Sequence, residues 1–125
     1  MPGREIIESA LTYKIRSGAF AVSNELGAGY LEWVYENALA IELRAAGLAV
    51  RTQVPLAVDY KGQVVGEYVA DMIVERRILL ELKATRQLAP EHEAQILNYL
   101  PATGIKVGLL INFGQSRVEM KRFVF

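Results

Sequence analysis

The chain has 125 residues, of which 52% are hydrophobic, 22% charged and 9% aromatic, as in globular domains and unlike disordered or collagen-like chains. It contains no cysteine, which excludes disulfides, thiolate zinc sites, iron–sulfur clusters and cysteine nucleophiles. Lysine plus arginine and aspartate plus glutamate each number 14, for a formal net charge of +0, so any contact with nucleic acid must rest on a local patch.

The length predicts one domain over residues 1–125, because domains usually run to roughly 100 to 200 residues. Met1 to Glu8 carries acids and no long apolar run. We therefore expect neither a secretory signal nor a membrane-spanning helix, no membrane partner, and a soluble cytoplasmic protein.

The first part of the chain predicts two helices. From Glu5 to Asn24 apolar residues recur at helical spacing, and Gly27 and Gly29 end this segment. A second amphipathic segment runs from about Tyr30 to Ala46, before Gly47.

The middle of the chain changes to the pattern of strands. Val50 to Asp59, Val64 to Val74 and Ile78 to Ala84 are rich in β-branched and aliphatic residues, with turn candidates at Lys61-Gly62 and Glu75-Arg76. We predict a three-stranded antiparallel meander.

The last part predicts one helix and two strands. Pro90 suits the first turn of a helix that continues to about Leu100, before Pro101 and Gly104. Lys106 to Asn112 reads as a buried central strand, and Arg117 to Phe125 as another strand. The chain is thus of the α/β class, in the order helix, helix, three strands, helix, two strands.

Charges within the two strands around Glu75-Arg76 need an explanation. Glu81 and Lys83 share one face of their strand, because side chains alternate along a strand. If a three-residue loop centred on Arg76 joins the strands, Asp71 lies opposite Glu81 on the same face; a two-residue turn would offset them.

Two carboxylates side by side repel, and a divalent metal such as Mg²⁺ relieves that repulsion. Lys83 would then orient or deprotonate a water and neutralise charge on a phosphate. The alternative from spacing alone is a structural ion pair at a strand end.

Two further groups of residues are candidates for the site. Helical spacing sets Glu32 on one side with Tyr35 and Glu36, although Glu32 at a helix start also suits the helix dipole and Tyr35 also suits a packed core. Gln95 and Tyr99 lie one helical turn apart and share a stripe with His92, the only histidine, so a histidine-based zinc site or triad has no support.

An ordered set of motifs gives a more specific signal: Gly29-x-x-Glu32-x-x-Tyr35, then Asp71, Glu81-Leu82-Lys83 and Gln95-x-x-x-Tyr99, followed by Val107 to Gly114. This set closely resembles the GxxExxY family of the PD-(D/E)XK nuclease superfamily, from about Leu11 to Phe125. The resemblance implies a restriction-endonuclease-like core, a mixed sheet flanked by helices.

The resemblance also implies roles for single residues. Asp71 and Glu81 would bind Mg²⁺ or Mn²⁺, Lys83 would be the catalytic lysine, and Glu32 would help to hold metal or water. Gln95 and Tyr99 resemble an element of RecB-type nuclease domains that supports the lysine and the nucleic-acid backbone. We add Tyr35 and Arg86 as expected substrate contacts, Arg86 as part of a local basic patch.

Two positions depart from the family pattern. Ser23 stands where family members usually have a histidine, which weakens the metal site, and Ala28 stands where proline is common.

These residues support a metal-dependent nuclease acting on nucleic acid, DNA more than RNA. A chain of this length leaves no room for a separate recognition domain, so we expect specificity to come from a homodimer or a partner protein. The alternative is a catalytically degenerate module that binds nucleic acid or assembles with protein, favoured by Ser23 and the neutral charge. A structural ion-pair domain without a nucleic-acid partner is the third alternative.

Overall fold

The structure is a computed structural model and describes residues 7–125. These residues form three helices and five strands in the predicted order. The elements are α1 (Ser9–Leu26), α2 (Glu32–Ala45), β1 (Val50–Tyr60), β2 (Gln63–Val74), β3 (Ile78–Lys83), α3 (Pro90–Thr103), β4 (Val107–Asn112) and β5 (Glu119–Val124).

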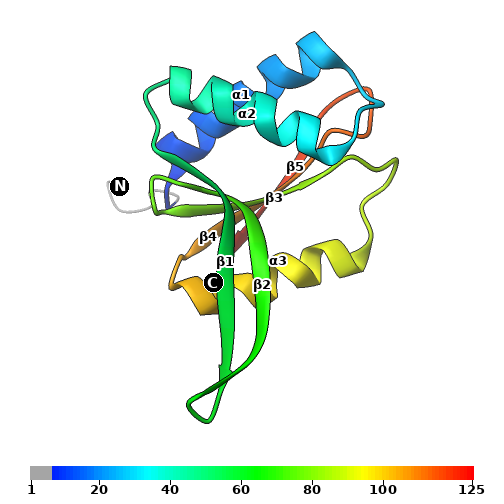
Figure 1. The fold of residues 1–125 in the computed structure, drawn as a ribbon. Coiled ribbons are helices and arrows are strands. Elements are labelled where there is room, and N and C mark those ends of the chain that lie inside the picture. Colours follow the sequence, from blue (N-terminus) through cyan, green and yellow to red (C-terminus); the bar gives the residue numbers. More distant parts are fainter. Residues whose placement is uncertain (1–6) are drawn as a thin grey trace, which may run out of the picture.

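The five strands form one mixed sheet in the order β1-β2-β3-β4-β5. Only β3 and β4 are parallel, and α3 makes the crossover between them, whereas the other neighbours are antiparallel. The helices α1 and α2 lie together on one side of the sheet, and α3 lies on the other (Figure 1). The mixed sheet flanked by helices confirms the expected restriction-endonuclease-like core. No helix within residues 7–125 is long and apolar enough to cross a bilayer.

Two apolar clusters cover the two faces of the sheet. On α1, Leu11, Ile15, Ala19 and Val22 recur at helical spacing and pack with α2 and one face of the central strands. On the other face, Ile96 and Leu100 of α3 pack against residues of β1, β2 and β3. Because β3 and β4 are covered on both sides, they are buried along nearly their whole length.

The hairpin of β1 and β2 is longer than the rest of the sheet. It turns at Lys61 and Gly62, both with positive φ, and its turn lies beyond α3 at the bottom of the view (Figure 1). The predicted turn is therefore confirmed, and the outer part of the hairpin carries exposed apolar side chains, among them Tyr60 and Val64.

The element ends differ from prediction in two places. The first helix begins at Ser9, after Glu8 with a φ of 59°, and the first residues of the predicted range, Glu5 and Ile6, lie outside the described residues. The third helix continues through Pro101 to Thr103 and ends at Gly104, whose φ is 72°. Pro101 has no amide to donate to the preceding turn, and beyond it the Thr103 hydroxyl donates to the Leu100 carbonyl over 2.8 Å.

Candidate active site

The loop between β2 and β3 sets the register of the candidate site. Val74 pairs with Ile78, so the connection is the three-residue loop of Glu75, Arg76 and Arg77. Glu75 and Arg76 have φ values of 53° and 57°. The paired positions run from Val74↔Ile78 to Met72↔Leu80, and the next position in the same register sets Asp71 opposite Glu81, as the three-residue alternative predicted.

At that next position carboxylates take the place of backbone acceptors. The Asp71 amide donates to Glu81 Oε1 over 3.1 Å, and the Leu82 amide donates to Asp71 Oδ2 over 2.8 Å. Glu81 is 2% exposed. Burial, and next the charge of Asp71, raise the pKa of Glu81 from 4.5 to about 8, while Lys83 acts in the opposite direction. We call Asp71 and Glu81 the acidic pair.

The strand β2 changes face at Asp71. Ala70 packs in the cluster on the α3 side, whereas Met72 packs in the cluster on the side of α1 and α2, although regular alternation would put them on one face. Opposite Asp71 on β1 lies Gln53, between the pairs Thr52↔Met72 and Val54↔Ala70, with a φ of 51°. The strand geometry is irregular at both Gln53 and Asp71. The Asp71 carboxylate lies toward β3, where it accepts the Leu82 amide.

A cavity of 340 Å³ opens beside Asp71, between the start of α2 and the strands. Its polar lining includes Glu32, Glu36, which helical spacing had already placed on the side of Glu32, and Gln53, which the sequence did not single out. Gln53 Nε2 donates to Glu36 Oε1 over 2.6 Å. Burial raises the pKa of Glu36, and the charges of Asp71 and Glu32 act in the same direction. The sequence indicated Glu36 by its place one helical turn after Glu32. It gave no signal for Gln53, whose backbone has a positive φ.

The acids fit a divalent cation through two carboxylates rather than three. Within residues 7–125 no group of three or more histidine, aspartate or glutamate side chains is gathered closely enough to hold a metal ion. The resemblance implied that Glu32 helps to hold the metal or a water. In the structure Glu32 does not form one close group of ligands with Asp71 and Glu81. Mg²⁺ usually binds through one or two carboxylates plus water and substrate phosphate, and a buried pair of like charges is stabilised by a cation. The acidic pair meets both conditions.

Helix α3 places Gln95 and Tyr99 near the acidic pair. Gln95 Nε2 donates to Tyr99 Oη over 2.9 Å, and Tyr99 is 5% exposed. Burial raises the pKa of Tyr99, and the charges of Glu81 and Asp71 raise it further. The predicted Gln-x-x-x-Tyr stripe is thus one hydrogen-bonded unit within electrostatic range of the acids. His92 caps the same helix, where its Nδ1 accepts the Ala89 amide.

The half-buried Lys83 ends β3, and a polar cluster fixes the backbone that follows it. The Phe113 amide donates to the Lys83 carbonyl over 2.8 Å. The fully buried Asn112 accepts the amides of Thr85 and Gly114 at Oδ1, and donates from Nδ2 to the Thr85 carbonyl and Glu119. We call this cluster the Asn112 clamp.

The exposed Arg86 lies just beyond the Asn112 clamp. Gln115 Nε2 donates to its carbonyl over 2.6 Å, which holds its backbone while its side chain remains in solvent.

Tyr35 lies in the core and not on the site surface. It is fully buried, stacks on Phe113 and donates to the Gly27 carbonyl over 2.6 Å. The expected substrate contact does not fit this burial, and the alternative of a packed aromatic does. Tyr35 instead holds the loop that precedes Glu32. Ser23 is buried in the last turn of α1, where its carbonyl accepts the Gly27 amide.

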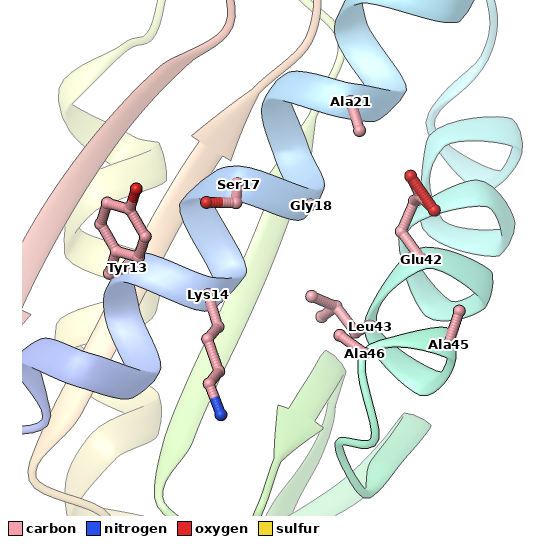
Figure 2. Close-up of a pocket in the computed structure, with 9 residues that line it drawn as sticks. All are labelled: Tyr13, Lys14, Ser17, Gly18, Ala21, Glu42, Leu43, Ala45 and Ala46. Atoms are coloured by element: carbon pink, nitrogen blue, oxygen red, sulfur yellow. The ribbon is translucent and has the colours of Figure 1, made fainter.

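Another cavity, of 390 Å³, lies between α1 and α2 (Figure 2). Its lining is mostly small or apolar, with Glu42 as the single acid, and none of the predicted site residues lines it. The helices approach closely here because Gly18 faces Leu43. The groove therefore reflects helix packing and lies outside the candidate site.

Comparison with known proteins points to one family. Residues 9–123 match a family model described as the PD-(D/E)XK nuclease superfamily. No curated protein sequence matches the chain.

Two solved structures resemble the fold. The crystal structure of SSO0001 superposes with a TM-score of 0.61 at 21% identity and covers 94% of this chain, which spans 59% of that protein. An alkaline exonuclease (LHK-Exo) from Laribacter hongkongensis superposes with a TM-score of 0.51 at 12% identity, over 96% of this chain and 72% of the exonuclease. At these identities the likeness concerns the fold alone.

Proposed function

The chain belongs to the PD-(D/E)XK nuclease superfamily, and we propose that it is a metal-dependent nuclease that hydrolyses phosphodiester bonds, with DNA as the preferred substrate. The observation that carries this proposal is the acidic pair with Lys83 two residues further along β3. Keeping the buried Glu81 beside the half-buried Asp71 costs free energy, and a site that binds a cation and a phosphate accounts for this arrangement.

Mg²⁺ or Mn²⁺ is the cofactor we propose, held by Asp71 and Glu81. A cation there would favour the ionised form of Glu81 and offset negative charge that develops on the phosphate. The acidic pair alone repels a phosphate, so cleavage should depend on the metal.

The residues of the chain would divide the remaining work. Lys83 would orient the attacking water and donate to the phosphate oxygen that gains charge as the new P–O bond forms and the bond to the leaving oxygen breaks. Gln95 and Tyr99 would support Lys83 and the nucleic-acid backbone, and the exposed Arg86 would contact a phosphate outside the reacting centre.

Within the superfamily we place the chain in the GxxExxY family. The support is the ordered set of motifs from Gly29 to Tyr99. In this proposal a second copy of the chain or a partner protein supplies sequence specificity.

A second candidate function has its own support. Ser23 in place of the usual histidine, and a formal net charge of +0, favour a catalytically degenerate module that binds nucleic acid or assembles with protein. Such a module need not bind Mg²⁺, so metal dependence separates the two candidates.

The test is cleavage of labelled single- and double-stranded DNA and RNA with Mg²⁺, Mn²⁺ or a chelator. We expect metal-dependent cutting that falls by about 100-fold or more in Lys83→Ala, the scale of losing one transition-state donor. The control is Lys14→Ala, an exposed lysine of α1, which should cut like the parent. A folded parent that cuts no substrate under any condition would contradict the proposal and leave the binding module.

A further inference from the structure

The exposed Tyr68 lies three residues before Asp71 on β2. Tyr68 is 51% exposed. Its ring packs on Tyr99 with 5.4 Å between the ring centroids and 44° between the ring planes. Tyr99 itself is 5% exposed. One part of the Tyr68 ring is thus supported by the protein, and another part faces solvent.

Tyr99 connects this exposed ring to the site. The Tyr99 hydroxyl accepts the Gln95 amide, which leaves its ring as the support for Tyr68. Burial is the main cause of its raised pKa, and the charges of Glu81, Asp71 and Tyr68 all add to it. Tyr99 is therefore in contact with Tyr68 and within electrostatic range of the acidic pair.

The surface beside Tyr68 is open. Gly66 lies two residues earlier on the same strand, so it shares a face with Tyr68, and a Cβ placed on Gly66 would meet nothing within 4 Å. Across β1, the partner of Tyr68 is the buried Leu56. The Tyr68 ring is supported by Tyr99 on one side and lies next to Gly66, which has no side chain. There is therefore room for a second ring to stack on it.

The chemistry of this surface selects a neutral, planar ligand. Tyr68 carries no positive charge to bind a phosphate and lies near two carboxylates, so an anionic group is disfavoured without a metal. Every nucleobase presents a π-face that stacks on an aromatic side chain, and stacking needs a base that is not paired inside a duplex.

We propose that Tyr68 is a stacking surface for an unpaired nucleobase next to the phosphodiester bond at the acidic pair. This inference rests on the proposed function and deepens it: the substrate class is single-stranded nucleic acid, or the unpaired end of a duplex. Tyr68 acts in binding and takes no part in the transfer of protons.

The binding test uses the Asp71→Asn background, which keeps a side-chain oxygen for the Leu82 amide and removes one of the two carboxylates. Single-stranded DNA that contains 2-aminopurine, and a blunt duplex of the same sequence, are titrated by anisotropy and by quenching of the fluorescent base. We expect Tyr68→Ala to weaken binding of the single strand by about tenfold and to abolish the quenching. Tyr68→Phe keeps the ring and should bind within about twofold of the background.

The matched control is Tyr60→Ala on the same hairpin. Tyr60 is 62% exposed, but its ring lies beside Lys61, with Nζ 5.4 Å from the centroid, and at the far end from the acids. The Tyr60→Ala variant should bind the single strand and the blunt duplex as tightly as the Asp71→Asn background does. Equal binding by Tyr68→Ala and the background, or equal loss on single strand and blunt duplex, overturns the stacking proposal.

A separate cleavage assay in the native background distinguishes the two proposals. If the parent cuts but Tyr68→Ala cuts single strands equally well, the stacking proposal fails and the nuclease stands. If the parent cuts nothing while Tyr68→Ala loses binding and quenching, the nuclease fails and the stacking surface stands as part of a binding module.

Discussion

Two buried polar clusters flank Lys83, and they differ in how their groups are paired. In the Asn112 clamp a neutral amide is fully buried, accepts two backbone amides and donates to two oxygens. In the acidic pair the buried Glu81 and the half-buried Asp71 accept backbone amides, and burial, followed by the charge of Asp71, raises the pKa of Glu81 to about 8.

The difference separates a structural role from a functional one. A buried polar group with all its partners adds stability and fixes one conformation. Buried like charges cost stability unless a ligand compensates them. The clamp thus positions the end of β3, and the acidic pair keeps an unfavourable charge arrangement that a cation would relieve.

The largest expected effect comes from breaking the clamp. Asn112→Ala leaves the amides of Thr85 and Gly114 without their acceptor, and we expect the free energy of unfolding to fall by about 3 kcal/mol or more, since each buried unpaired group costs about 1–3 kcal/mol. Urea denaturation measures the change. Asn98→Ala on the exposed side of α3 is the control, and equal stability of the two variants would contradict the structural role of the clamp.

A second prediction tests the close approach within the clamp. A Cβ on Gly114 would overlap the backbone of Thr85, which is not free to move because Asn112 bonds both its amide and its carbonyl. Gly114→Ala should lower the free energy of unfolding by about 2 kcal/mol, the scale of overpacking in a fixed environment.

Gly66→Ala is the matched control for Gly114→Ala. It also lies in the described part of the chain and has no atom within 4 Å of the added methyl group, so denaturation midpoints should stay close to the parent. A midpoint for Gly114→Ala as high as that of Gly66→Ala would mean that Thr85 shifts without cost.

Much of the fold was predictable from the sequence because it depends on local patterns. Helical spacing, strand alternation and the glycine turns predict all the elements in order. The register of Asp71 and Glu81 stayed open between two connections at Arg76, and the structure shows the three-residue loop. The extension of α3 past Pro101 was missed, because the Thr103 hydroxyl and Gly104 complete the last turn in a way that a proline rule does not anticipate.

The surroundings of the acidic pair were less predictable because they depend on contacts between distant segments. Gln53 lies opposite Asp71 only after a register shift between Val58 and Asp59, and no local signal marks that shift. The support of Tyr68 by Tyr99 joins a strand and a helix about 30 residues apart in the sequence. Glu36, in contrast, was already on the side of Glu32 by helical spacing.

A further prediction is a dependence of stability on pH that comes mainly from the acidic pair. In the folded, metal-free protein Glu81 keeps its proton up to a pKa of about 8, whereas an ordinary glutamate has 4.5. Between these values the folded state binds more protons than the unfolded state, so stability falls as pH rises, by at most about 1.4 kcal/mol per pH unit. Above about pH 8 this group adds no further change.

Urea denaturation in chelator from pH 5 to 9 tests this dependence, with Glu81→Gln as the variant and Glu67→Gln, an exposed residue of β2, as the control. Glu81→Gln should remove most of the slope and leave a small one of the same sign from Glu36, whose pKa is also raised. Glu67→Gln should keep the parent's profile. Mg²⁺ should stabilise the parent more at pH 8 than at pH 5, because a cation binds the ionised carboxylates. A parent profile that is flat in chelator would show that the acidic pair is not under electrostatic strain, and the contrast with the Asn112 clamp would then disappear.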